Sequence, residues 1–180
     1  MTYIVTKFVK SGDLLSYMEK LGVDRLPEAM ARVFIKQIAI AVATYHAEGV
    51  AHRDLKHLNI LVSMKGTSPK VKITDFGMAA RLKAGQTITK MAGTISFMSP
   101  EIVLEKPSDF KTDIWSLGVI LYALICSRAP FCAAEREEMV RQITSEEVDF
   151  SDSVWSTVTD SCKDLIHQML DKDQKKRISV

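Results

Sequence analysis

The sequence predicts a mainly α-helical domain with a few short β-strands. Three observations support this fold class: apolar residues recur at helical spacing in several segments, β-branched residues gather in only three short runs, and a long central stretch has no regular period. The chain has 180 residues, the length of one ordinary domain, and no internal repeat or Gly-, Ser- or Pro-rich linker divides it.

The composition is that of a folded protein with nearly balanced charge. Hydrophobic residues make up 47% and charged residues 26%, which excludes a disordered or fibrous chain. Lysine and arginine total 24 against 22 acidic residues, too balanced to favour a nucleic-acid or membrane partner. The longest apolar run, residues 114–126, is too short to cross a bilayer. Three cysteines without a CxxC pair fit reduced thiols. We therefore expect a cytoplasmic protein, with the nucleus as the alternative compartment.

In the first part of the chain we expect one strand followed by two helices. Residues 1–9 are rich in β-branched and aromatic side chains and therefore favour a strand. A short helix is expected over residues 14–21, with Asp13 near its start. A long helix should begin around Pro27, which is tolerated in a first turn, and end at Gly49.

A hairpin and an irregular stretch should follow. Two short β-like runs, residues 60–62 and 71–73, are joined by a Lys-Gly-Thr-Ser-Pro segment that favours a hairpin connection. Residues 74–107 then show neither helical nor strand periodicity. A stretch of this length inside a compact domain is either a functional loop or an element that the pattern does not reveal.

The remaining elements are helices. Residues 113–126 are apolar on nearly every side, which predicts a helix through the middle of the core. Residues 135–143 are amphipathic and charged, and therefore favour a surface helix. Residues 161–170 offer an apolar face for a final helix against the core.

The strongest chemical signal is the segment His-Arg-Asp-Leu-Lys-His-Leu-Asn at residues 52–59. It places Asp54, Lys56 and Asn59 in a loop between a helix and a strand. The aspartate can accept a hydroxyl proton, the lysine can lie against a transferring phosphate, and the asparagine oxygen suits a hard Mg²⁺ ion. An isolated His-Arg-Asp would more simply be a polar turn capped by Asp54, but the neighbouring residues favour phosphoryl transfer.

Further motifs follow in a fixed order. Asp75-Phe76-Gly77 comes directly after a β-like run, where a carboxylate beside a flexible glycine can hold a metal ion. The other motifs are Ala92-Gly93-Thr94, Ser99-Pro100-Glu101 and Asp113-Ile114-Trp115. This ordered set, over essentially the whole chain, resembles the C-terminal lobe of the eukaryotic serine/threonine protein kinases. The sequence KITDFGMAARL and the Ala-Pro-Phe turn at residues 129–131 look most like the calcium/calmodulin-dependent-kinase-like branch, although no calmodulin-binding segment is present.

The resemblance implies a catalytic role for four residues. Asp54 would be the catalytic base, and Thr94 would bridge Asp54 and Lys56. Lys56 matches the lysine typical of serine/threonine kinases, and Asn59 and Asp75 would be the Mg²⁺ ligands. ATP and Mg²⁺ are the implied cofactors, and a protein serine or threonine hydroxyl is the implied acceptor.

The resemblance also implies a nucleotide site and a division of the chain. Residues 1–9 would be the last strand of the N-terminal lobe and the hinge, and residues 10–180 the C-terminal lobe, truncated at its C-terminal end. Thr6 would be the gatekeeper. The residues that would contact adenine or ribose are Lys7 and Val9 through their backbone, Asp13 at the ribose, and Leu61 under the adenine ring.

Two structural contacts are implied as well. His52 and Phe76 would belong to an apolar spine that Asp113 anchors from the central helix. Glu101 would form a buried ion pair with Arg177, important for the fold rather than for the chemistry. The remaining histidines, His46, His57 and His167, have no metal-ligand spacing and are expected at the surface or in packing.

Several positions bear on control and substrate. Arg53 beside Asp54 is typical of kinases switched on by phosphorylation, which implies an upstream activating kinase as a possible partner. Lys90 stands at the usual phosphosite, so Thr87 or Thr89 would be displaced substitutes unless both are ordinary exposed threonines.

Two positions that recognise basic substrates in kinases of this type carry different residues in this sequence. Leu58 and Ser96 stand where basic-substrate kinases of this type often carry glutamates. A preference for arginine before the target residue is therefore not implied.

The sequence also lacks parts of a complete kinase domain. It contains no glycine-rich phosphate loop, no strand lysine and no partner-glutamate helix, so the N-terminal lobe is almost entirely absent. We therefore expect a fragment that transfers phosphate weakly or not at all. The alternative is a non-catalytic lobe that binds substrates or regulators in competition with a full-length relative. A purely structural helical protein is disfavoured, because it gives no reason for Asp54 and Asn59.

Overall fold

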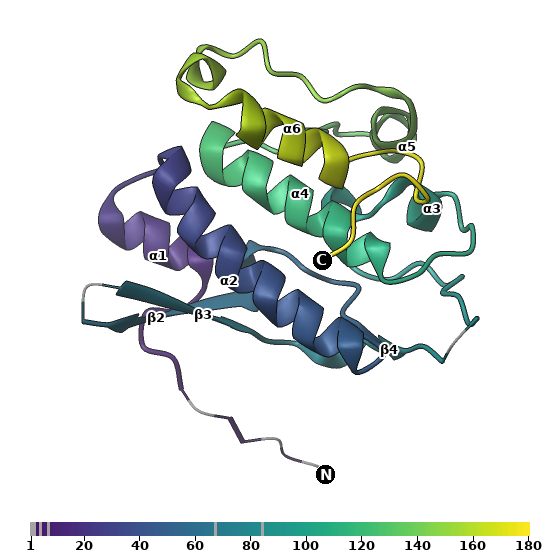
Figure 1. Ribbon diagram of the computed structural model, residues 1–180, viewed down its shortest axis with the longest axis horizontal. Helices are drawn as coiled ribbons and strands as arrows, with labels where there is room; N and C mark the ends of the chain where they lie inside the picture. The colour runs from purple at the N-terminus through teal and green to yellow at the C-terminus, as the bar shows by residue number, and fades with distance from the viewer. Residues whose placement is uncertain (1–2, 4, 7, 67, 84) are drawn as a thin grey trace.

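The computed structural model describes residues 3, 5–6, 8–66, 68–83 and 85–180 (Figure 1). The α-helices are α1 (Leu14–Leu21), α2 (Glu28–Ala47), α3 (Pro100–Val103), α4 (Lys111–Cys126), α5 (Arg136–Ser145) and α6 (Asp160–Met169). The strands are β1 (Val50–Ala51), β2 (Ile60–Lys65), β3 (Ser68–Ile73) and β4 (Ala80–Arg81). Short 3₁₀ turns lie at His57–Asn59, Phe76–Met78, Ile95–Phe97 and Ser153–Thr157. The mainly helical fold with few short strands is confirmed.

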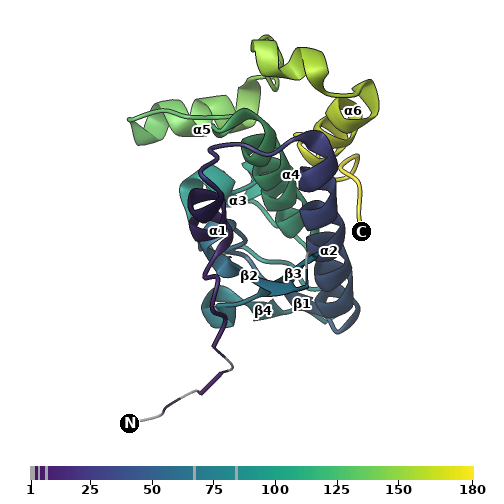
Figure 2. The ribbon, with the colours of Figure 1, turned by 90° about the vertical axis from the view of Figure 1, so that its left-hand side faces the viewer.

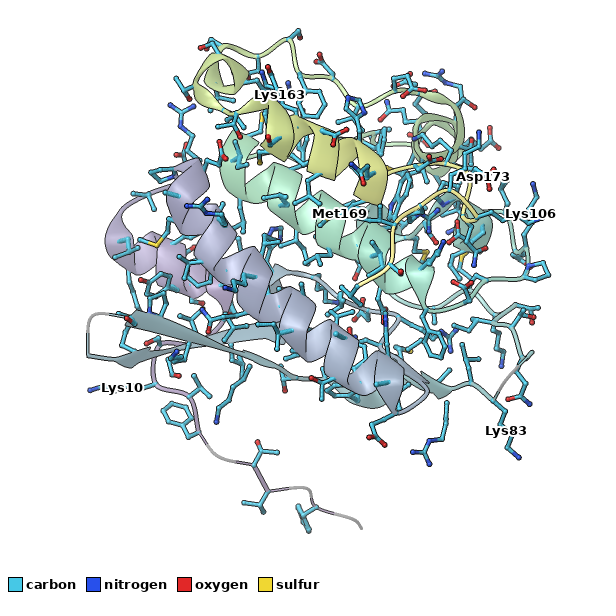
Figure 3. The ribbon with its side chains drawn as sticks, in the orientation of Figure 1. Lys10, Lys83, Lys106, Lys163, Met169 and Asp173 are labelled. Carbon is cyan, nitrogen blue, oxygen red and sulfur yellow. The ribbon has the colours of Figure 1, made fainter. Side chains whose placement is uncertain are left out.

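Helix α4 runs through the centre of the body, between α2 and α6 (Figure 1). Nearly all of its residues are buried, including Trp115 and Asp113, as the all-round apolar pattern predicted. Gly118 allows α6 to approach closely, because a Cβ at this position would lie 2.8 Å from the Cβ of Met169. Met169, labelled in Figure 3, belongs to the end of α6 that packs on α4. The backbone of α4 at Gly118 is therefore packed directly against the side chain of Met169.

Helices α1 and α2 are bounded by the residues that the sequence indicated. Asp13 caps α1, since its Oδ1 accepts a hydrogen bond of 3.0 Å from the backbone N of Ser16. Pro27 precedes the first turn of α2, and Gly49, with φ 74°, follows its end. Both helices are confirmed.

The predicted hairpin is also present. Strands β2 and β3 pair in antiparallel register, with Ile60 opposite Ile73. Gln37 of α2 fastens the hairpin to the helix, because its Nε2 donates to the carbonyl of Pro69 at 3.1 Å and its Oε1 accepts from the backbone N of Val71 at 3.2 Å. Gln37 thereby joins α2 to β3, and the pairing of Ile73 with Ile60 links β3 to the start of β2.

A second pair of strands has only two residues each and was not predicted. β1 and β4 pair in antiparallel fashion, with Val50 opposite Arg81 and Ala51 opposite Ala80. β1 leads directly into the loop that begins at His52, and β4 follows the Asp-Phe-Gly motif. This pairing therefore holds the two candidate catalytic segments side by side.

The strand predicted over residues 1–9 is wrong at the positions that the structure describes. Residues 3, 5, 6, 8 and 9 form no strand, and in Figures 1 and 2 this segment extends away from the helices. The composition favours a strand, but a strand also needs a neighbour for its backbone hydrogen bonds, and none of the described strands lies beside it. Among the described residues, no helix has the length and apolar character needed to cross a membrane.

Candidate active site

The loop that carries Asp54 is anchored to the core by one buried carboxylate. Asp113 of α4 accepts hydrogen bonds from the backbone N of His52 at 2.8 Å and of Arg53 at 2.9 Å. The Nε2 of His46 lies 2.9 Å from the same carboxylate. His46 was expected at the surface or in packing, and its contact with Asp113 was not predicted. A signal existed: a carboxylate in an otherwise apolar helix needs donors around it.

The anchored loop also contacts the Asp-Phe-Gly segment. The rings of His52 and Phe76 lie with their centroids 4.7 Å apart, and the Nε2 of His52 lies 3.0 Å from the carbonyl oxygen of Thr74. His52 is fully buried, whereas Phe76 is 45% exposed. The expected packing of His52, Phe76 and Asp113 is therefore observed, with the phenylalanine at its open end.

The carboxylate of Asp54 lies at the centre of a hydrogen-bond network. Its Oδ1 accepts from the backbone N and from the Oγ1 of Thr94, both at 3.1 Å. Its Oδ2 accepts from the Nζ of Lys56 at 2.8 Å and from the Nδ2 of Asn59 at 3.3 Å. Lys56 also donates to the Oγ1 of Thr94 at 2.9 Å, so all four residues are directly linked. These four polar side chains meet at one point from two segments of the chain.

Gly93 explains how Thr94 reaches Asp54. Gly93 has φ 102°, a conformation that side chains rarely tolerate, and a Cβ at this position would lie 2.5 Å from the carbonyl oxygen of Arg53. The backbone therefore passes close to the Asp54 loop only because residue 93 has no side chain.

Asn59 and Asp75 are connected through the backbone. The N of Thr74 donates to the carbonyl oxygen of Asn59 at 3.0 Å, which places Asp75 one residue beyond this contact. Asn59 donates through its Nδ2 to the carbonyl of Asp54 at 2.8 Å, which leaves its Oδ1 available as a ligand. Asp75 has φ 61°, and its Oδ1 accepts from the N of Gly77 at 3.2 Å. One amide oxygen and one carboxylate suit Mg²⁺, which usually completes its shell with phosphates and water.

Within the described ranges there is no cluster of three or more His, Cys, Asp and Glu residues that could hold a metal. A Mg²⁺ ion held by Asn59 and Asp75 would have two protein ligands and room for phosphate and water oxygens. This is the arrangement expected for a metal that binds together with a nucleotide.

The residues expected at the nucleotide lie where the N-terminal segment meets the hairpin. Asp13 and Leu61 form an isolated antiparallel bridge, and the N of Val62 donates to the carbonyl of Gly12 at 2.9 Å. Burial would raise the pKa of Asp13, but hydrogen bonds from Ser16 outweigh it, so this pKa is lower than usual. Val9 accepts a hydrogen bond of 3.2 Å from the N of Gly12. Lys7 lies outside the described residues.

Comparison with known proteins assigns the family. A model of the protein kinase domain matches residues 1–180. The chain belongs to the protein kinase family. Protein kinases transfer the γ-phosphate of ATP and use Mg²⁺, so the chain is by family part of an ATP-dependent enzyme.

The relatives of this kinase chain are serine/threonine kinases. It is 34% identical to serine/threonine-protein kinase PEPKR2 of Arabidopsis thaliana, over 99% of this chain and 37% of the relative. It is 38% identical to calcium-dependent protein kinase 4 of Arabidopsis thaliana, over 99% of this chain and 35% of the relative. It is 33% identical to calcium/calmodulin-dependent serine/threonine-protein kinase 1 of Oryza sativa subsp. japonica, over 99% of this chain and 29% of the relative.

These comparisons confirm the resemblance to serine/threonine kinases of the calcium/calmodulin-dependent branch. The chain spans about a third of the length of the three relatives.

The kinase chain contains the expected buried ion pair. Arg177 donates through Nη1 and Nη2 to the two carboxylate oxygens of Glu101 at 2.7 and 2.8 Å. Arg177 is 1% exposed, and its guanidinium lies 5.1 Å from the centre of the Trp115 ring. Two parallel hydrogen bonds compensate for the loss of water around both charges. This pair fastens α3, which follows the Thr94 segment, to the C-terminal end of the chain.

His57 lies between Lys56 and Asn59 in the loop that carries Asp54. It takes part in packing, one of the two expected roles. Its ring contacts Phe97 edge-on, with centroids 5.5 Å apart. Burial lowers the pKa of His57 to about 4, although the nearby charge of Asp13 opposes this shift. His57 is therefore neutral at pH 7 and adds no charge beside Lys56.

Proposed function

We propose that the chain is the C-terminal lobe of a serine/threonine kinase that transfers the γ-phosphate of MgATP to a protein hydroxyl. On this proposal residues 1–9, which form no strand at the described positions, correspond to the last N-lobe strand and hinge of a complete kinase domain, and residues 10–180 form the C-terminal lobe. The main support is the joining of Asp54, Lys56, Asn59 and Thr94 in one hydrogen-bond network.

Asp54 acts as the base in this proposal. An incoming serine or threonine hydroxyl would donate to the Asp54 carboxylate in place of one present donor, such as the Oγ1 of Thr94 at 3.1 Å. Lys56, 2.8 Å from Asp54, carries a positive charge that would face the transferring phosphate. The backbone N of Thr94 would keep the carboxylate oriented during this exchange.

The metal and nucleotide sites are part of the same proposal. Asn59 and Asp75 would hold Mg²⁺, which supplies positive charge to the phosphate oxygens. The backbone of Lys7 and Val9 would bind adenine beside the gatekeeper Thr6. Asp13 would face the ribose and Leu61 would lie under the adenine ring, consistent with the bridge between these two residues.

The partners in this proposal are a protein substrate and an activating kinase. The substrate would carry the serine or threonine that approaches Asp54. A phosphate added to Thr87 or Thr89 would enter a surface pocket whose lining includes both threonines, Arg53 and Arg81. Both threonines are exposed and therefore accessible to modification.

The isolated 180-residue polypeptide is expected to transfer phosphate weakly or not at all. In kinases a glycine-rich loop and a strand lysine cover and fix the phosphates, and this sequence contains neither. Because phosphoryl transfer depends on positioning and electrostatics, the remaining groups would hold ATP loosely. The alternative function, a lobe that binds substrates or regulators without catalysis, would keep its binding when transfer is absent.

A radiolabelled transfer assay with matched variants tests the proposal. The full 180-residue chain is incubated with labelled MgATP and a general protein acceptor. We expect weak labelling that falls by about 100-fold or more in Asp54→Asn, the lower range for loss of a catalytic base. The control Asp160→Asn removes an exposed carboxylate at the start of α6 and should have no effect.

Equal labelling by wild type and Asp54→Asn would contradict the proposed chemistry. A turnover within the range of intact kinases, about 1–100 per second, would instead contradict the expected weakness of the isolated chain. Absent labelling with retained binding of the acceptor protein would favour the non-catalytic lobe.

A further inference from the structure

A pocket of about 380 Å³ lies beside the candidate active site and takes no part in the hydrogen-bond network described above. Its buried lining includes Val119 and Leu124 of α4 and Met18 of α1. Leu15 of α1, which is 41% exposed, lines the pocket at the surface of the protein. A mainly apolar concavity that reaches the surface is typical of a binding site.

The pocket lies directly next to the residues that surround Asp54. His57, three residues after Asp54, lines the pocket, and so do Ser96 and Phe97, two and three residues after Thr94. The rings of His57 and Phe97 contact each other with centroids 5.5 Å apart, which joins these two lining segments. An extended polypeptide advances about 3.3–3.6 Å per residue. A chain whose hydroxyl approaches Asp54 would therefore reach this pocket with a side chain only a few residues away.

The pocket offers little to a basic side chain. Among the described lining residues, the charged ones are Asp24 and Arg128, which are exposed and have opposite charges. Exposed ion pairs contribute little to binding. The carboxylate of Asp13, which lies near His57, is engaged in capping α1, because its two oxygens accept from the backbone N and the Oγ of Ser16 at 3.0 and 2.9 Å.

His57 adds no charge to the pocket either. Burial lowers its pKa to about 4, so the ring is neutral at pH 7. The neighbouring Leu58 is 55% exposed and adds apolar surface next to His57. The side of the Asp54 loop that faces the pocket is therefore suited to an apolar group.

We propose that this pocket receives an apolar side chain of the protein substrate, a few residues from the serine or threonine that approaches Asp54. The substrate class is then defined by an apolar residue and not by an arginine. Burial of an apolar side chain of the size of leucine is favourable without a charged partner. This inference rests on the proposed function in taking a protein substrate as the occupant of the pocket.

Peptide binding to the full chain, measured by NMR without nucleotide, tests the inference separately from phosphoryl transfer. Each peptide is a glycine-, serine- and alanine-based sequence with a central serine and one leucine, whose position is moved along the peptide. A matched series carries arginine in place of leucine. We expect one leucine position to bind at least about tenfold more tightly than the matching arginine peptide. Amide resonances of Ala123, Leu124 and the Asp54 loop should shift, and those of α6 should not.

Two leucines of α1 provide a matched pair of variants. Leu15 and Leu21 are 41% and 49% exposed, and of these two only Leu15 is among the described lining residues of the pocket. Leu15→Glu should weaken binding of the leucine peptide by about fivefold or more, because it replaces apolar lining with a charge. Leu21→Glu should leave the binding of both peptides unchanged.

Several results would overturn the inference. Arginine peptides that bind as tightly as leucine peptides would do so, and so would equal binding with leucine at every position. Equal losses in Leu15→Glu and Leu21→Glu would show that the effect is not local to the pocket. Pocket resonances of the peptide-free chain that shift on dilution would identify a second copy of the chain as the occupant. If Leu15→Glu fails to fold, the two peptide series on the wild type still decide.

The result also separates this inference from the proposed chemistry. Leucine-dependent binding at the pocket, together with absent phosphoryl transfer, would support the pocket as a subsite and contradict only the catalytic proposal. Transfer that depends on Asp54, without any preference for the leucine peptides, would support the chemistry and overturn the inference.

Discussion

The two halves of the candidate site are held in different ways. The half proposed to bind the phosphoacceptor is buried: Asp54 and Asn59 are largely inaccessible, and Asp113 fixes their loop from the central helix. The half assigned to the nucleotide lies at an exposed edge, where Val5 is 94% and Phe8 84% exposed.

This difference separates groups that are ready to react from groups that a ligand must order. A carboxylate already surrounded by donors needs little reorganisation when a substrate arrives. Exposed side chains instead lose about 0.5–1.5 kcal/mol each in conformational entropy when binding immobilises them. We therefore expect substitutions in the first half to change stability and chemistry together, and substitutions in the second half to change nucleotide affinity alone.

The largest effect on stability should come from the buried ion pair. Glu101→Gln leaves Arg177 buried without a counter-charge, which should lower the free energy of unfolding by about 3–5 kcal/mol. Urea denaturation measures this change. Glu138→Gln, which breaks an exposed pair with Arg141, is the matched control and should have little effect. Similar losses in the two variants would remove the distinction between buried and exposed regions.

Gly93→Ala should be the next most damaging substitution. The new Cβ would meet the carbonyl oxygen of Arg53 at 2.5 Å, in a backbone conformation with φ 102°. Left-handed strain alone costs about 1–3 kcal/mol, and relief of the clash would move Thr94 away from Asp54. Faster amide exchange at Thr94 would measure the movement. Gly85→Ala is the control, because it shares the positive φ but has open space around it. Unchanged exchange in Gly93→Ala would show that the close approach is not needed.

His57 should make the buried half sensitive to acid. Its pKa is lowered to about 4 in the folded chain, so the unfolded chain takes up a proton first as the pH falls below about 6.5. Stability is therefore complete above pH 6.5 and is lost toward pH 4, with a loss of about 2 kcal/mol between pH 7 and pH 5. His57→Gln should abolish this part of the pH dependence in urea denaturation. An identical pH dependence in both proteins would contradict the assignment.

The smallest effect is expected at the exposed edge. Phe8→Ser replaces a side chain that is 84% exposed, so the free energy of unfolding should change by less than about 0.5 kcal/mol. Thermal and urea denaturation measure this directly. A loss above about 1 kcal/mol would mean that this segment packs on the body in solution, and the comparison between the two halves would then weaken.

The sequence predicted those parts of the fold that local patterns specify. The bounds of α1 agreed residue for residue, since Asp13 supplies a cap and Gly22 a left-handed end. The two-residue strands β1 and β4 were missed, because a pair of residues has no measurable period. The strand expected at the N-terminus has the right composition but no described partner strand, and pairing is a property of the whole fold.

In the candidate site, too, local motifs were predicted and long-range contacts were not. The motifs indicated Asp54, Lys56, Asn59 and Thr94, and the structure joins them by hydrogen bonds across 40 positions of sequence. The contact between His46 and Asp113, 67 positions apart, could not be read from a motif. Long-range contacts of this kind depend on which helix faces meet, and periodicity specifies faces without specifying partners.

Paramagnetic relaxation by Mn²⁺ tests the central claim most directly, because it reports where a nucleotide-bound metal resides. The full chain, labelled with ¹⁵N, is titrated with Mn²⁺ and ADP, and the broadening of each amide resonance is recorded. We expect broadening centred on Asn59, Asp75 and the Asp54 loop, which Asp75→Asn should abolish and Asp160→Asn should leave intact. Broadening centred elsewhere, or unchanged in Asp75→Asn, would contradict the claim that these residues surround one metal site.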